Sequence, residues 1–132
     1  MLSKHLIPTL AAILIAIPPA ATSAEFQPGH TEEGLASYYH DGLHGRPTAS
    51  GEIYDKRASS AAHKSLPLGT RVRVTRLSDG RSIEVRINDR GGPFVKGRII
   101  DLSRRSARDL GIIDGGLTKV KVEVLSLPER RK

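Results

Sequence analysis

The fold is decided by the stretch RVRVTRLSDGRSIEVRIND, residues 71–89. Apolar and polar residues alternate in its first half and again in its second half. The pair Asp79-Gly80 separates the two alternating runs, and an Asp-Gly pair in that place is the strongest short-range signal for a β-hairpin. The stretch therefore predicts two adjacent antiparallel strands.

Short strands are also expected on both sides of this hairpin, at residues 34–39, 97–102 and 119–125. A short helix is expected between the last two, because Ser103 can cap its start and Gly111 can end it. Several short strands and no long amphipathic segment predict a mainly β fold, a small closed barrel with one or two short helices. Closure also removes exposed sheet edges.

Two other segments are less decided by their pattern. Residues 40–51 are dense in glycine, proline, serine and threonine, which predicts a loop. The run Ala58-Ser-Ser-Ala-Ala62 fits a short helical turn or a close-packed strand, and its periodicity does not choose between them.

The two ends of the chain are expected to lie outside the barrel. Residues 1–24 combine a weak basic start, an apolar core and small residues before Glu25, as a cleavable secretory signal does. A membrane anchor is the alternative, which the short apolar run disfavours. Residues 25–33 are polar and predict a flexible lead-in. Residues 34–126 then form one domain, and residues 127–132 form a charged tail.

Composition narrows the setting and the partner. The chain has no cysteine, so export would bring neither disulfides nor a lipid attached to an N-terminal cysteine. We therefore expect a soluble exported monomer, in the bacterial periplasm or outside the cell, without a membrane anchor after signal cleavage. The net charge of +7 attracts polyanions. Because the sequence has no nucleic-acid motif and few aromatic residues, we expect the anionic cell wall, not nucleic acid, as the partner.

Asp89 is the candidate chemical centre, because it ends an alternating strand and precedes two glycines. Cleavage of a glycosidic bond needs a proton donor, whereas a free aspartic acid has a pKa of about 3.9 and is ionised at neutral pH. A cluster with Glu52, Asp55 or Asp101 would raise the pKa of Asp89. Arg90 would oppose this unless strand alternation turned it away. Alternatively, Asp89 only closes an Asx turn.

Other candidate residues also have structural alternatives. Asp101 could be a buried acid paired with Arg98, and His63, alone in its segment, could be a satisfied structural histidine. His40 and His44 have a spacing that suits a metal on a helix. Because glycines make this segment a loop, we expect neither a metal nor another cofactor.

Five motifs occur in order along the chain: GLASYY from Gly34, HGRPTASGEIYD from His44, AAHKSLPLGT from Ala61, VRINDR from Val85 and GRIIDLS from Gly97. Together they resemble the rare lipoprotein A-like septal ring lytic transglycosylases, over about residues 34–125. The resemblance implies a six-stranded double-psi β-barrel, a fold shared with expansins. It also implies cleavage of peptidoglycan glycan strands, preferably stripped of peptides, between N-acetylmuramic acid and N-acetylglucosamine, leaving 1,6-anhydro ends.

The same resemblance implies roles for individual residues. It implies Asp89 as the single carboxyl that acts first as acid and then as base, with Glu52, Asp55 and His63 around the cleft. Asp101 matches an essential aspartate of the related expansin-type barrels and is a secondary catalytic candidate.

Five residues are candidates for substrate contacts. Tyr39 and Tyr54 could stack on sugar rings, although core packing is the alternative for at least one of them. Ser50 lies in a segment of small side chains, where a polymer could approach the backbone closely. Arg46 could meet a carboxylate of the glycan or pair with a protein acid. Arg90, next to the candidate acid, is the fifth.

Three features depart from the family pattern. The family usually reads Asp-Arg-Gly-Pro-Phe, whereas a second glycine here lengthens the loop and leaves the placement of Pro93 and Phe94 open. The lipid-attachment cysteine and the C-terminal septal binding domain are absent, so targeting to the division site is not expected. The short chain, its basic surface and the arginine beside the acid leave an alternative function, a non-catalytic expansin-like module that binds or loosens the wall.

Overall fold

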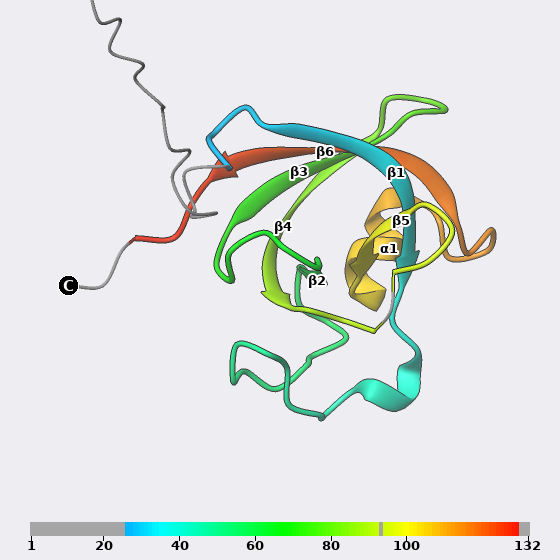
Figure 1. The fold of residues 1–132 in the computed structure, drawn as a ribbon. Helices are drawn as coiled ribbons and strands as arrows, with labels where there is room; N and C mark the ends of the chain where they lie inside the picture. Colours follow the sequence, from blue (N-terminus) through cyan, green and yellow to red (C-terminus); the bar gives the residue numbers. More distant parts are fainter. Residues whose placement is uncertain (1–25, 93, 130–132) are drawn as a thin grey trace, which may run out of the picture.

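The computed structural model describes residues 26–92 and 94–129, which form a closed barrel with a short helix packed against it (Figure 1). Around the barrel the strands follow the order β1-β5-β2-β4-β3-β6. The elements in chain order are β1 (Thr31–Tyr38), η2 (Asp41–Leu43), β2 (Ser60–Ala62), β3 (Arg71–Arg76), β4 (Ser82–Asp89), β5 (Arg98–Leu102), α1 (Arg104–Leu110) and β6 (Thr118–Ser126). The expected small mainly β barrel is confirmed.

The predicted hairpin is present as β3 and β4. The two strands are antiparallel, and Val72 lies opposite Val85. The connection closes with a hydrogen bond of 2.7 Å from the Arg76 N–H to the Arg81 carbonyl. Gly80 takes a φ of 79°, which a residue without a Cβ adopts readily. The Asp-Gly pair therefore marks the turn, as its sequence predicts.

Two parallel pairs interlock the barrel. β1 runs parallel to β5 and β2 runs parallel to β4, while the other neighbours are antiparallel. Parallel neighbours need long crossover connections, so strands adjacent in space are distant in sequence. β2 also settles the segment that periodicity left open. Residues 60–62 form a strand, and all three are buried, because their small side chains let the strand lie between β4 and β5.

The barrel interior is filled by aliphatic side chains from every long strand. The strand residues buried in this core are Ala36, Ala61, Val72, Val74, Val85, Ile87, Ile100, Leu102, Val120, Val122 and Val124. Helix α1 adds Ala107 and Leu110 to the same core. Its ends are those predicted: the Ser103 hydroxyl accepts a hydrogen bond from the Ser106 N–H, and Gly111 ends the helix in the left-handed conformation.

The expected lead-in of residues 25–33 is wrong at its C-terminal end. Strand β1 begins at Thr31, which pairs with Glu123 of β6. Residues 31–33 of β1 have polar side chains, and two of them are exposed. No alternation of apolar residues therefore indicates a strand there. Its backbone pairing holds it in the sheet.

The expected signal of residues 1–24 and the last three residues of the charged tail, 130–132, lie outside the described residues. Across residues 26–92 and 94–129, no helix has the length and apolar character needed to cross a membrane.

Candidate active site

Two carboxylates flank one alanine on the barrel wall. Asp89 at the end of β4 and Asp101 in β5 both lie opposite Ala62 of β2. Residues opposite one another on neighbouring strands point to the same face of a sheet, so both acids share the face of Ala62. Adjacent strands are about 4.8 Å apart, which separates the two acid backbones by roughly 10 Å. Asp101 is thus the one acid expected in the site that shares with Asp89 a partner on β2, among the described residues.

Asp89 accepts hydrogen bonds from the Tyr39 hydroxyl and from several backbone N–H groups. The Tyr39 hydroxyl donates to Oδ2 over 2.5 Å, and the backbone N–H groups of Ala49 and Arg90 donate to Oδ1 over 2.9 and 2.8 Å. Burial raises the pKa of Asp89, but donation by Tyr39 and by backbone N–H groups outweighs burial, and the pKa lies below its usual value. The sequence left open whether neighbouring acids raise this pKa. The donors lower it instead, so Asp89 is favoured as the anion.

Asp101 has the opposite electrostatic environment. It is partly buried and accepts one hydrogen bond, of 3.1 Å, from the Ser37 hydroxyl. Burial raises the pKa of Asp101 above its ordinary value, although Ser37 and the charge of Arg98 oppose the rise. No ion pair joins Asp101 to Arg98 among the described residues, and the Arg98 Nε is buried without a hydrogen-bond partner there. The site therefore contains one acid whose pKa lies below its usual value and one whose pKa lies above it.

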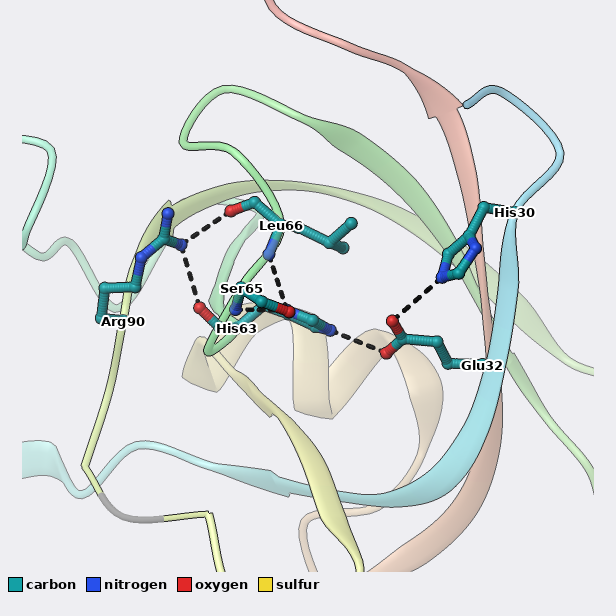
Figure 2. Close-up of polar contacts among 6 residues, drawn as sticks. All are labelled: His30, Glu32, His63, Ser65, Leu66 and Arg90. Atoms are coloured by element: carbon teal, nitrogen blue, oxygen red, sulfur yellow. Dashed lines mark hydrogen bonds and ion pairs between the residues drawn. The ribbon is translucent and has the colours of Figure 1, made fainter. Parts of the chain in front are cut away.

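Strand alternation turns Arg90 away from Asp89. Its Nη1 donates to the carbonyl oxygens of His63 and Leu66, over 3.0 and 2.7 Å (Figure 2). The guanidinium therefore does not pair with the Asp89 carboxylate. The structure gives it a structural role on the 63–66 turn, so the expected contact between Arg90 and the substrate has no support in its orientation.

The His63 side chain makes no hydrogen bond to Asp89 or Asp101 either, among the described residues. Its Nδ1 accepts hydrogen bonds from the backbone N–H groups of Ser65 and Leu66, so Nε2 carries the proton and donates to Glu32 over 2.8 Å (Figure 2). The side chain is only 1% exposed. Only the backbone N–H of His63 reaches Asp89, at its carbonyl oxygen. The geometry supports the alternative of a satisfied structural histidine.

The Glu52 side chain binds two residues of β4 that precede Asp89. Its carboxylate accepts hydrogen bonds from Arg86, at 2.8 and 2.9 Å, and from Asn88, at 3.0 Å. The hydrogen bond from Arg86 is the main cause that lowers the pKa of Glu52. These contacts dock the loop of residues 48–52 onto the end of β4, and the same loop supplies the Ala49 N–H to Asp89. Glu52 thus supports the site indirectly.

Asp55 is exposed and closes a local turn. It accepts a 2.8 Å hydrogen bond from the Arg57 N–H. Neither Asp55 nor Glu52 contacts the Asp89 side chain in the described part of the chain. The expected cluster of these acids is therefore not formed.

The two tyrosines stack on each other. The ring centroids of Tyr39 and Tyr54 lie 4.4 Å apart with an interplanar angle of 18°, and both rings are buried. This geometry supports core packing over stacking on a sugar. The roles that sequence reasoning missed belong to Ser37 and Tyr39, which bond the two acids. Their i, i+2 spacing, which puts two side chains on one face of a strand, is the signal that could have found them.

Arg46 and Ser50 lie on the exposed loop before β2 and stay candidates for substrate contacts. His44 accepts a hydrogen bond from the Lys56 N–H at its Nδ1. Among the described residues, no three histidine, aspartate or glutamate side chains gather into a metal site.

The lengthened loop after the candidate acid needs only one of its two glycines. Gly91 has a φ of 70°, and a Cβ there would lie 3.0 Å from the Ala62 Cβ. A Cβ on Gly92 would meet nothing within 4 Å. Phe94 packs against the stacked tyrosines, and Pro93 lies outside the described residues.

Removal of the Tyr39 hydroxyl tests how Asp89 is held. In Tyr39→Phe we expect the pKa of Asp89 to rise, because the strongest donor that offsets burial is lost. A ¹³C titration of the Asp89 carboxyl measures this without any activity assay. Tyr54→Phe is the matched control, since its hydroxyl accepts from the Arg104 N–H and does not touch Asp89. Equal titration curves in Tyr39→Phe and the wild type would contradict this assignment.

Solved structures of other proteins share this barrel. The Streptomyces papain inhibitor superposes with a TM-score of 0.62 at 23% identity, over 76% of this chain and 99% of the inhibitor. An expansin of Clavibacter michiganensis superposes with a TM-score of 0.57 at 22% identity, over 76% of this chain and 53% of the expansin. At these identities the likeness establishes the fold alone, which is the expected expansin-like double-psi β-barrel.

Sequence similarity establishes the family. Residues 31–122 match the family described as lytic transglycolase, and the chain belongs to that family. It is 54% identical over 99 residues to the endolytic peptidoglycan transglycosylase RlpA of Pasteurella multocida (strain Pm70), covering 75% of this chain and 33% of that protein. It is 58% identical over 95 residues to the probable endolytic peptidoglycan transglycosylase RlpA of Nostoc sp. (strain PCC 7120 / SAG 25.82 / UTEX 2576), covering 70% and 25%. The chain thus spans a third or less of the length of these curated relatives.

Proposed function

We propose that this protein is a lytic transglycosylase that cleaves peptidoglycan glycan strands between N-acetylmuramic acid and N-acetylglucosamine. The observation that carries the proposal is the pair of carboxyl groups on one barrel face, with the pKa of one lowered and the pKa of the other raised, in a member of the lytic transglycolase family. Peptidoglycan lies outside the cytoplasm, so the function requires export, for which residues 1–24 are the proposed signal.

The two environments divide the chemistry between the two acids. Asp101, whose pKa is raised by burial, donates a proton from its protonated form to the glycosidic oxygen as the bond from that oxygen to the muramyl C1 breaks. The ionised Asp89 takes the proton of the muramyl 6-hydroxyl, whose oxygen then bonds to C1. The products are a free 4-hydroxyl on N-acetylglucosamine and a 1,6-anhydro end, and no water is consumed. A proton returning from Asp89 to Asp101 through solvent resets the site. This scheme is an alternative to the expected single acid-and-base role of Asp89.

Product analysis tests the function. The purified protein is incubated with intact sacculi and with sacculi stripped of stem peptides, and the soluble products are analysed by mass spectrometry. We expect 1,6-anhydro glycans, lighter than hydrolysis products by one water, with a higher yield from stripped sacculi. Products that carry a reducing end would indicate hydrolysis and contradict the proposal.

The ionised state of Asp89 supports a second candidate function. A carboxylate that several donors hold as the anion can also bind sugar hydroxyls without reacting, which suits an expansin-like module that binds or loosens the wall. Sedimentation of the protein with sacculi, with no soluble products in the same reaction, is the outcome that would favour this candidate.

A further inference from the structure

A hollow of about 370 Å³ opens where the end of β1, the turn η2 and the start of α1 meet. Its lining includes Ser37 and Tyr39, the residues that hold Asp101 and Asp89. Because two residues of its lining bond the acids, we expect a sugar in the hollow to be close to the bond that the acids attack. This location suits a subsite that binds one sugar of the glycan strand next to the proposed reaction centre.

Arg104 supplies the positive charge of this hollow. Its Nη1 donates to both carboxylate oxygens of Asp41, over 3.1 and 3.3 Å. Among the described residues, its Nε and Nη2 have no hydrogen-bond partner. The backbone N–H of Arg104 donates to the Tyr54 hydroxyl, which fixes the residue beside the stacked tyrosines.

The ion pair that Arg104 makes is open to exchange. The Arg104 side chain is 37% exposed and that of Asp41 is 59% exposed. Ion pairs at such exposure contribute little free energy, whereas a guanidinium binds an incoming carboxylate through two parallel hydrogen bonds. A carboxylate on a ligand can therefore replace or join Asp41 at low free-energy cost.

We propose that Arg104 binds the lactyl carboxylate of a muramic acid residue next to the cleaved bond. This proposal rests on the proposed function for the identity of the glycan. The lactyl group carries a charge only after the stem peptide has been removed, because the peptide is attached to it through an amide. Arg104 is thus a specificity-determining residue that favours stripped strands, and Asp41 competes with the substrate for it.

Binding of two defined saccharides tests the proposal. One is a tetrasaccharide of alternating N-acetylglucosamine and N-acetylmuramic acid with free lactyl groups, and the other is chitotetraose, which has none. Both are titrated calorimetrically into the Asp89→Asn protein, which prevents turnover. In Arg104→Gln we expect about tenfold weaker binding of the muramyl saccharide, the effect of one lost charged hydrogen-bonded contact, and unchanged binding of chitotetraose.

Two further variants separate recognition from structure. Asp41→Asn breaks the same ion pair but removes the competitor, so we expect it to tighten binding of the muramyl saccharide severalfold. Arg105→Gln is the matched control on the same helix, since Arg105 pairs with Asp109 and does not line the hollow. We expect it to bind both saccharides as the parent does.

Three outcomes would overturn the proposal. They are equal binding of the two saccharides by the parent protein, equal losses for both saccharides in Arg104→Gln, and weaker binding of the muramyl saccharide in Asp41→Asn. Because none of these measurements needs turnover, the subsite and the proposed reaction can fail separately. A protein without lytic products that still shows the predicted binding pattern keeps the subsite and loses the reaction.

Discussion

Asp89→Asn lowers the release of anhydro-ended glycans about 1,000-fold, within the range expected for loss of a general base. An amide cannot take the proton of the muramyl 6-hydroxyl. The variant keeps the fold, because the amide oxygen can still accept from the Ala49 and Arg90 N–H groups and the amide nitrogen can donate to the Tyr39 hydroxyl. Quantification of anhydro products from stripped sacculi, together with the melting temperature, measures both effects. An active Asp89→Asn protein would contradict the assignment of the base.

Asp101→Asn distinguishes the two-acid scheme from the single-acid scheme. If Asp101 is the proton donor, its loss lowers activity by a factor similar to that of Asp89→Asn. If Asp89 acts alone, Asp101→Asn keeps most of the activity, because only the hydrogen bond with Ser37 is disturbed. Measurement of both variants on one glycan substrate decides between the schemes.

The pH dependence of activity is a second test of the roles proposed for Asp89 and Asp101. The base must be ionised, and the pKa of Asp89 is lowered, so activity rises with pH below the usual range of aspartate. The acid must be protonated, and burial raises the pKa of Asp101, so activity falls as pH exceeds that raised value. The wild type should show a bell-shaped kcat/KM, and the residual activity of Asp101→Asn should lack the alkaline fall.

The fold could be predicted where local pattern decides it. The Asp79-Gly80 turn, the helix between Ser103 and Gly111 and the position of Asp89 at a strand end are all encoded within a few residues. The start of β1 could not be predicted, because Thr31 and its neighbours are polar and are held by pairing with β6, about 90 residues away in sequence.

The site was predicted less well than the fold, because its chemistry depends on contacts between distant segments. The donors that lower the pKa of Asp89 include Tyr39 and Ala49, 50 and 40 residues away. Glu52 belongs to the loop that carries Ala49, yet its carboxylate turns to Arg86. A sequence motif places a residue near a site, but strand alternation and loop docking decide which way its side chain points.

His63→Ala destabilises the protein by about 2–4 kcal/mol, the range for a buried group that leaves several hydrogen bonds unsatisfied. The variant leaves the N–H groups of Ser65 and Leu66 without their acceptor and removes the donor to Glu32. Activity per folded molecule stays near that of the wild type, because the imidazole makes no hydrogen bond to Asp89 or Asp101. Urea denaturation gives the free energy of unfolding. Activity measured well below the midpoint separates folding from catalysis.

His44→Ala is the matched control for His63→Ala, because His44 is exposed and accepts a single backbone hydrogen bond. We expect it to change stability by less than about 1 kcal/mol. If the His63→Ala protein were as stable as the wild type but inactive, the prediction would be wrong and His63 would have a catalytic role.

Glu32, the hydrogen-bond partner of His63, makes the stability of the fold depend on pH. The hydrogen bond from His63 lowers the pKa of Glu32 to about 2, from 4.5 in a free side chain. The ionised Glu32 therefore stabilises the fold above pH 4.5, and this contribution, at most about 3 kcal/mol, is lost as pH falls from 4.5 towards 2. In Glu32→Gln we expect lower stability at neutral pH and a smaller loss across that acid range. The same acid-induced loss in Glu32→Gln and in the wild type would show that other carboxylates carry it, and that the link between β1 and His63 is weaker than its geometry indicates.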